Sequence, residues 1–471
     1  MPPPDSEKLP RLSIALIPVY ALIALLYGAI RYLDASPHIP IILACSAAGL
    51  IALYLGYTWK HLLDSIVKSI SIALPSILIL LAIGILIGVW VASGIVPLMI
   101  DYGLKLLSPT YFLVASCLIC SVVSLATGSS WSTIATVGVA LIGAAQGLDI
   151  SLPMVAGAIV SGSYFGDKLS PLSETTNLAP AVAGSELFEH IKHMLYTTLP
   201  SMLIALTLYL VLGLYYNANG TDIEKVHALS ASLHEQFNLT PLLLLAPISI
   251  LVLIAFKIPA LPAILAGALF GGIFGMWIQE ITIGEMLTAM QYGYVSETGN
   301  AQTDQLLSRG GMSSMEYTIS LVLCSMSFGG LMEGTGMLKS IVQSLLNTTH
   351  KTGRIVASTV ATCIGMNIIV PDQYLSIIMP GRMYKSAFKK AKLAPKNLSR
   401  CLEDAGTLTS PLIPWNTCGA WVLGALMVDP FVYLPFAFLN LISPILSVIY
   451  GYTGWTMTPE LKTDSIEEPV Q

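Results

Sequence analysis

The chain has 471 residues, of which 22 are Lys or Arg and 27 are Asp or Glu. These charged residues make up 10% of the chain, whereas a soluble globular domain carries roughly 25%. Hydrophobic residues make up 55%, and the mean hydropathy is +0.75. This composition excludes an ordinary soluble enzyme. The net charge of -5 forms no basic face, so no nucleic-acid partner is expected.

Long uncharged runs predict an all-α polytopic membrane protein whose first partner is the lipid bilayer. Several runs, such as 73–100 and 196–216, reach the roughly 18 apolar residues that indicate a spanning helix. The apolar runs at 109–146 and 354–381 are expected to enter and leave the membrane on one side as re-entrant hairpins. The remaining runs predict about ten transmembrane spans by the same length criterion.

The strongest orientation signal is the segment 382–400, which is rich in Lys and Arg and has no acidic residue. Basic loops favour the cytoplasmic side of a membrane, so this segment is expected inside. Counting spans from it places both termini in the cytoplasm and the acid-leaning loops 217–239 and 279–314 outside.

Two sequence matches at nearly one spacing indicate an internal repeat. GDKLSPLSETTN at 166–177 aligns with GTLTSPLIPWNT at 406–417, and GVWVASG at 88–94 aligns with GLMEGTG at 330–336. The region equivalent to the basic segment, 142–160, has no Lys or Arg and is expected on the opposite side. The repeats are therefore predicted to be inverted, an arrangement typical of secondary transporters with broken helices.

These signals predict five regions in chain order. They are N-terminal scaffold spans (1–72), the first repeat with its hairpin and broken helix (73–216), linking spans and outside loops (217–314), the second repeat with its hairpin and broken helix (315–452) and a cytoplasmic tail (453–471).

Each repeat holds two places where a spanning helix is expected to break. In the first repeat they are SLATGSSWST and GSYFGDKLSPLSETTN, and in the second IGMNIIVPDQY and LEDAGTLTSPLIPWNT. Glycine and proline free backbone groups there, and these groups need partners inside protein or a wet cavity. Such breaks mark a binding site. The clustered hydroxyl, amide and carbonyl oxygens suit sodium better than a soft metal, although packing within a helix is the alternative for any single Ser or Thr.

Ionisable residues near the breaks are candidates for coupling, because a charge at membrane depth is retained mainly for function. They are Asp167, Lys168 and Glu174 in the first repeat, and Glu333, Asp372, Glu403 and Asp404 in the second. Glu174 is the favoured group for holding either a cation or a proton.

Several of these residues have simpler interpretations. Asp167 and Lys168 either pair with each other or lie solvated near the surface, and one of Glu403 and Asp404 is expected at the surface. His190 and His193 are expected at the membrane interface, with pH sensing as the alternative.

No nucleotide-binding loop or channel filter motif occurs, so an ion gradient is the expected energy source. No Ser/His or metal constellation stands out for an intramembrane enzyme, and the chain is expected not to be one. No cofactor is expected beyond the transported ions.

The stretches TGSSWSTIATVGVAL, SGSYFGDKLSPLSETTNLAP and EDAGTLTSPLIPWNTCGA resemble the NhaC family of sodium/proton antiporters, with similarity from about residue 70 to 450. The resemblance implies sodium/proton exchange in the bacterial inner membrane, a scaffold domain, a transport domain with two hairpins, elevator-type movement and a homodimer. The same family includes carriers that exchange malate with protons for lactate with sodium. Exchange or uptake of a small organic anion or amino acid is therefore the alternative, with Lys168 or Arg382 as the balancing cation.

Matching the family's motifs to this chain implies a set of ion and substrate contacts. In the first repeat these are Ser129, Ser130, Thr133, Asp167, Ser170, Glu174, Thr176 and Asn177, and in the second they are Asn367, Asp404, Thr409, Ser410 and Asn416. Coupling of ions and protons is assigned to Asp167, Glu174, Asp404 and Asp372, and sodium is expected at Ser129, Ser130, Asp167, Glu174 and Asn177. No carboxylate of the second repeat matches Glu174, so a symmetric pair of ion sites is not expected.

Overall fold

The computed structural model describes residues 9–460 apart from 34, 107, 218–222, 257, 298–300 and 347–350. Within these residues, seven helices are long and apolar enough to cross a membrane, or nine if two bent pairs count as one span each. The prediction of an all-α polytopic membrane protein with broken helices is confirmed. Fewer helices qualify than the about ten spans predicted from apolar length, because some apolar runs form shorter helices, such as His38–Tyr54 and Phe438–Thr453.

The helices follow one another in three stretches of the chain. The first holds α1 (Leu12–Tyr32), α2 (His38–Tyr54), α3 (Trp59–Ala92), α4 (Ile95–Leu106), α5 (Phe112–Thr127), α6 (Ser130–Thr133), the π-helix η2 (Ile134–Gly138), α7 (Val139–Gly147), α8 (Leu152–Leu169), α9 (Glu174–Ala183) and α10 (Leu187–Asn217). The second holds α11 (Ile223–Gln236), α12 (Leu245–Ala255), α13 (Ala260–Ile278), α14 (Ile283–Tyr292) and α15 (Ala301–Leu307). The third holds α16 (Glu316–Gly334), α17 (Met337–Leu346), α18 (Thr352–Ile369), α19 (Gln373–Lys390), α20 (Pro395–Leu402), the π-helix η5 (Glu403–Thr407), α21 (Thr417–Leu426), α22 (Pro430–Tyr433) and α23 (Phe438–Thr453). Short 3-10 turns are η1 (Pro109–Tyr111), η3 (Pro241–Leu244), η4 (Met312–Met315), η6 (Ser410–Leu412) and η7 (Leu434–Phe436).

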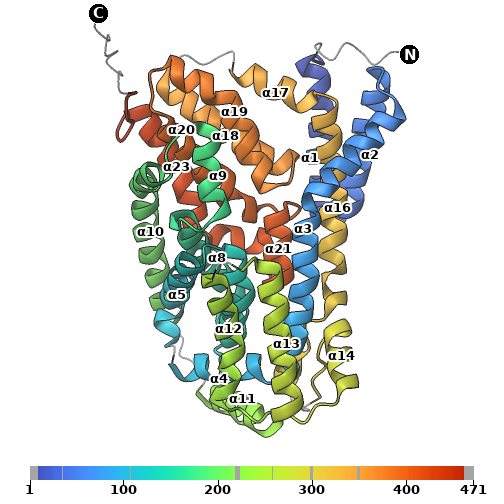
Figure 1. Cartoon of the computed structure of the whole chain (residues 1–471), viewed down its shortest axis with the longest axis vertical. Helices are drawn as coiled ribbons and strands as arrows, with labels where there is room; N and C mark the ends of the chain where they lie inside the picture. Colours follow the sequence, from blue (N-terminus) through green and yellow to red (C-terminus); the bar gives the residue numbers. More distant parts are fainter. Residues whose placement is uncertain are drawn as a thin grey trace, which may run out of the picture.

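The long helix α3 is the centre of one side of the molecule, where it packs against α13, α14 and α16 (Figure 1). Two of its glycines allow this close packing. A Cβ atom at Gly84 would lie 2.5 Å from the carbonyl oxygen of Gly311, and one at Gly88 would lie 2.1 Å from that of Ala289. Small residues at such contacts let helix backbones approach closely inside a membrane.

The other side of the molecule contains α5, α8, α10, α18–α20 and α23. Helices α5 and α8 make the closest pair, because α8 presents glycines to α5. A Cβ atom at Gly162 would lie 2.1 Å from the carbonyl oxygen of Cys117, and one at Gly166 would lie 2.4 Å from that of Ser121. This packing fixes the lower half of the broken helix α8–α9 against the first arm of a hairpin.

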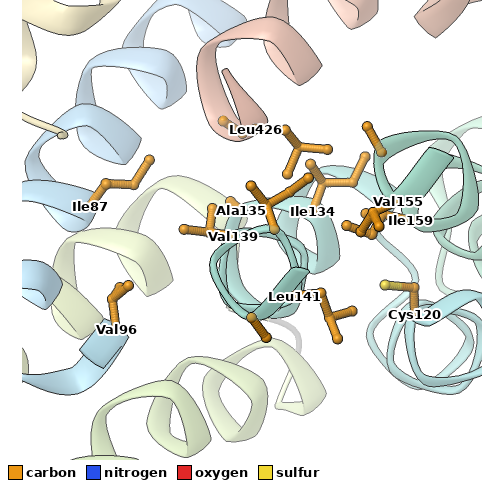
Figure 2. Close-up of a cluster of buried hydrophobic side chains, with 14 of the residues drawn as sticks. Ile87, Val96, Cys120, Ile134, Ala135, Val139, Leu141, Val155, Ile159 and Leu426 are labelled. Atoms are coloured by element: carbon orange, nitrogen blue, oxygen red, sulfur yellow. The ribbon is translucent and has the colours of Figure 1, made fainter. Parts of the chain in front are cut away.

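The first hairpin runs up through α5, turns at Gly128, and returns through α6, η2 and α7. Helix α5 begins in the lower half of the molecule in Figure 1. At the end of α7, Gln146 accepts a 3.1 Å hydrogen bond from Arg309. Figure 2 shows residues of the returning arm, such as Ile134 and Val139, surrounded by hydrophobic side chains of neighbouring helices. The returning arm is therefore packed within protein.

The second hairpin, α18 and α19, lies at the upper end of Figure 1 and joins the basic segment at its outer end. Asn397 of that segment donates a 2.7 Å hydrogen bond to the carbonyl of Thr458, near the C-terminal end of the described chain. At the other end of the chain, the carbonyl of Pro10 accepts a 2.7 Å hydrogen bond from Ser340 of α17. The two hairpins thus enter from opposite ends, and both described ends of the chain lie on the side of the basic segment.

Candidate functional site

The first broken helix is interrupted between Leu169 and Glu174, where Pro171 lacks a backbone donor. The freed backbone groups find partners in the next turn. The hydroxyl of Thr176 lies 3.1 Å from the carbonyl oxygen of Asp167 and 3.0 Å from that of Lys168. The amide of Ser173 donates a 3.2 Å hydrogen bond to the carbonyl oxygen of Ser170, and its side chain caps α9. The polar residues of SPLSETTN thus replace the missing helical hydrogen bonds.

The tip of the first hairpin presses on this break. Gly128 ends α5 in the left-handed conformation, and a Cβ atom there would lie 2.6 Å from Leu172. Ser129 then caps α6, and the hydroxyl of Ser130 donates a 2.7 Å hydrogen bond to the carboxylate of Asp167. Hairpin and break therefore share one polar centre.

Asp167 is the acidic residue of this first centre and is 6% exposed. The backbone amide of Ser130 and the hydroxyl of Ser173 also face its carboxylate. A buried carboxylate surrounded by hydroxyl oxygens can hold a small hard cation, which favours oxygen ligands. It can alternatively hold a proton, which removes its charge.

The second half also places a hairpin tip against a break, and amides and hydroxyls make the contacts between the two. Asn367 of α18 donates hydrogen bonds of 2.8 Å to the carbonyl oxygen of Gly406 and 3.0 Å to the hydroxyl of Thr409. Asn416 donates a 3.1 Å bond to the side-chain oxygen of Asn367. Asp372 lies at the hairpin tip as predicted, and its carboxylate caps α19 through a 2.9 Å bond from the amide of Leu375.

A buried ion pair joins the two halves. Lys168 of α8 donates to the carboxylate of Asp404 in η5, and both side chains are fully buried. Thr197 and Ser443 donate further bonds of 3.0 and 2.9 Å to the same carboxylate oxygen. Both simpler interpretations of Asp167 and Lys168 are wrong: the two side chains do not pair, because consecutive residues of a helix point in different directions, and both are buried.

Glu174 and Asn177 lie outside the first centre and are exposed. The carboxylate of Glu174 accepts a hydrogen bond from the hydroxyl of Tyr374 at the second hairpin tip. The amide of Asn177 donates to the carbonyl oxygens of Pro171 and Ser173, at 2.9 and 2.6 Å.

The predicted residues therefore separate into two largely buried centres, an exposed pair, and Asp404 in the buried ion pair. The first centre contains Ser129, Ser130, Thr133, Asp167, Ser170 and Thr176, and the second contains Asn367, Asp372, Thr409, Ser410 and Asn416. The exposed pair is Glu174 and Asn177.

Two expectations about the surface are wrong. Glu403 and Asp404 are both fully buried, because η5 continues inward from α20 and packs between α18, α19 and α23. His190 and His193 are 0% and 3% exposed, not interfacial. A signal was present for the histidines, since His190, His193 and Thr197 recur at the spacing of one helix face.

Aromatic contacts across the two halves were not predicted. Trp131 of the first hairpin stacks on Trp421 of α21 with ring centroids 4.4 Å apart. Nothing in the sequence singles out this pair, because the two residues come from different repeats.

A sequence model of the Na+/H+ antiporter family matches residues 11–176 and 162–455. Three relatives illustrate its range. The Na(+)/H(+) antiporter NhaC of Alkalihalophilus pseudofirmus is 39% identical over 95% of this chain and 97% of the relative. The Malate-2H(+)/Na(+)-lactate antiporter of Bacillus subtilis is 37% identical over 95% and 96%. The Arginine/ornithine antiporter ArcD of Halobacterium salinarum is 37% identical over 98% and 96%.

Proposed function

Because this chain belongs to the Na+/H+ antiporter family, we propose that it is a secondary active transporter that exchanges sodium ions for protons across a membrane. The observation that carries the proposal is the buried carboxylate of Asp167 with the hydroxyl of Ser130 at 2.7 Å. This carboxylate lies where a hairpin tip meets a helix break, the type of place where secondary carriers bind their cargo.

Exchange follows from the chemistry of one carboxylate. Sodium bound at Asp167 favours the ionised form, whereas a proton on the same group removes the charge that attracts the cation. Sodium and proton then occupy the centre in turn. Ser129 and Ser130 supply further oxygen ligands from the hairpin tip, and Ser173 supplies one from the break.

The other predicted contacts have different roles in this proposal. Glu174 and Asn177 are exposed and would meet the cation on its way into or out of the first centre. The second centre holds its hairpin by neutral hydrogen bonds, so Asn367, Thr409, Ser410 and Asn416 position the fold around the cargo.

A second candidate function is exchange of an organic anion or amino acid, since relatives with those names match almost the whole chain. A carrier of an organic anion needs a cationic group to balance its cargo. Lys168 is already paired with Asp404, and Arg382 is exposed. These observations favour sodium/proton exchange as the first candidate.

Several finer features belong to the same proposal. Two hairpins that enter from opposite ends support an inverted repeat. The basic segment and both described chain ends at one end of the molecule support cytoplasmic termini in a bacterial inner membrane. Helices α13, α14 and α16 gather around α3 on one side of the molecule, which supports a scaffold domain beside a transport domain. Elevator-type movement and a homodimer are proposed from the family resemblance.

Transport in proteoliposomes with an entrapped pH dye tests the proposal. Addition of sodium is expected to move protons without any organic substrate, while potassium serves as the comparison cation. Absence of sodium-dependent proton movement, together with uptake of a carboxylate or amino acid from a test panel, would replace the proposed function by the second candidate.

A further inference from the structure

Glu403 carries a buried carboxyl group that the sodium centre does not use. It is the first residue of the π-helix η5 and is fully buried. Among the described residues, neither of its carboxyl oxygens has a hydrogen-bond partner. The hydroxyl of Thr407 faces it, but this hydroxyl also makes no hydrogen bond in the described part of the chain. Short π-helical turns occur often at functional sites.

The charged groups around Glu403 leave its own charge without a partner. The ionisable groups that face it are Lys168, Asp167 and Asp404. Lys168 is paired with Asp404, so this pair is neutral as a unit. An ionised and unpaired carboxylate is strongly disfavoured in such surroundings. Glu403 therefore holds a proton in this conformation.

Further ionisable groups on the neighbouring helices face this ion pair. His190 of α10 faces Lys168, while Cys401 of α20 and Tyr450 of α23 face Asp404. Arg400, one turn before Glu403, is also buried. Its guanidinium donates to Thr456 and Met457 and lies over the ring of Tyr450. Within the described residues, none of these groups forms an ion pair with Glu403.

Buried polar side-chain atoms without protein partners also occur on α10 and η5 in the described structure. They are Nε2 of His193, both ring nitrogens of His190, Oγ1 of Thr198, Oδ2 of Asp404 and Oγ1 of Thr407. His193 faces Lys396 and Arg400 of the basic segment, and His190 faces both His193 and Lys168. Buried polar groups of this kind are usually satisfied by ordered water. Ordered water and histidine side chains can both relay protons.

We propose that Glu403 is a proton-carrying site of the transport cycle, separate from the sodium centre at Asp167. Its proton passes to and from the side of the basic segment by way of the buried side chains of His190 and His193. This rests on the proposed function. On release, the O–H bond of the Glu403 carboxyl breaks and its proton passes to a water molecule, leaving the carboxylate near Lys168. On uptake, a hydronium ion returns the proton and the same bond forms again.

The test compares Glu403→Gln with the unchanged protein in proteoliposomes. Glutamine keeps the shape of the protonated acid but cannot release a proton. We expect Glu403→Gln to bind sodium with unchanged affinity and to move fewer protons per sodium ion than the unchanged protein, because only the exchange at Asp167 remains. The matched control is Glu189→Gln, on the same side of the molecule, whose carboxylate is 58% exposed. This control is expected to transport as the unchanged protein does.

A second measurement separates a proton carrier from a structural acid. In pH-induced infrared difference spectra, the unchanged protein should show a protonated carboxyl band that disappears in Glu403→Gln. Glu403→Asp, which can still bind a proton, should restore part of the transport and is the variant to use if Glu403→Gln does not fold. Normal proton movement by Glu403→Gln, or no band assignable to Glu403, would overturn the proposal.

The two proposals can fail separately. If the unchanged protein moves no protons with sodium, the proposed function fails, and the infrared band still decides whether Glu403 binds and releases a proton. If sodium-driven proton movement is present but Glu403→Gln leaves it intact, only the inference about Glu403 fails.

Discussion

The two hairpin tips meet their helix breaks with the same geometry but with different chemistry. In the first half, Ser130 contacts the carboxylate of Asp167. In the second, Asn367 contacts a backbone carbonyl and the hydroxyl of Thr409. The alignment of the repeats places Thr407 opposite Asp167. The first junction thus carries a carboxylate at its break, whereas the second junction has a threonine at that position and its acid, Asp372, caps α19 at the hairpin tip.

The two junctions show that a repeated fold need not repeat its chemistry. At the second junction the side chains of Asn367, Thr409 and Asn416 pair with one another or with a backbone carbonyl, so this junction can stabilise the fold without a ligand. An ion at the first junction would balance the charge of Asp167, which has hydrogen-bond donors but no ion-pair partner among the described residues. The following variants test whether the two junctions differ in this way.

The largest effect is expected from Asp167→Asn. The amide keeps an oxygen acceptor for Ser130 but removes the charge, so the variant should fold and lose sodium/proton exchange completely. Transport in proteoliposomes and sodium-dependent thermal stabilisation measure this loss. Retention of sodium-dependent stabilisation in Asp167→Asn would mean that the first junction is not the cation site.

A large loss of stability is expected from Lys168→Met, which leaves Asp404 buried without its cation. Breaking a buried pair costs about 3–5 kcal/mol, while replacing both partners by apolar residues restores much of this free energy. The free energy of unfolding of Lys168→Met should therefore fall well below that of the double variant Lys168→Met/Asp404→Leu. Equal stability of single and double variants would show that the pair does not join the two halves.

A smaller loss of stability is expected from Asn367→Ala in the neutral junction. It removes a buried amide and leaves Asn416 without one acceptor, which costs about 1–3 kcal/mol of unfolding free energy. Sodium affinity of the folded protein should be unchanged, because this junction holds no ion. A loss of sodium affinity that exceeds the loss of stability would give the second junction a direct role in binding.

The smallest effect is expected from Glu174→Gln. Its carboxylate is exposed and accepts a hydrogen bond from Tyr374, which glutamine can also accept. Transport should be lowered less than in Asp167→Asn, with the stoichiometry of exchange unchanged. If Glu174→Gln abolishes exchange and Asp167→Asn does not, the coupling carboxylate is Glu174.

Much of this arrangement could be predicted from local sequence, because helix breaks have local causes. Gly128 and Ser129 end and restart a helix at one tip, and Pro371 and Asp372 do so at the other. Glycine, proline and capping residues act within one turn, so their effects are visible in a single segment.

The rest depends on contacts between distant segments. Lys168 and Asp404 are 236 positions apart, and no local pattern tells which of the neighbouring acids a lysine will reach. Glu403 follows a basic segment that suggests a surface position, yet three other helices enclose it. Glu174 shows the reverse: its place in the break suggests a buried site, yet as the first residue of α9 it is exposed.

The most direct measurement of sodium and proton competition at Asp167 is the sodium affinity of the unchanged protein as a function of pH. Calorimetric titration in detergent gives the apparent dissociation constant at each pH. If one proton leaves when sodium binds, this constant should rise about tenfold for each unit of pH below the pKa of the site, and Asp167→Asn should show no binding at any pH. A sodium affinity that does not change with pH, or that survives in Asp167→Asn, would contradict a shared site for the two ions.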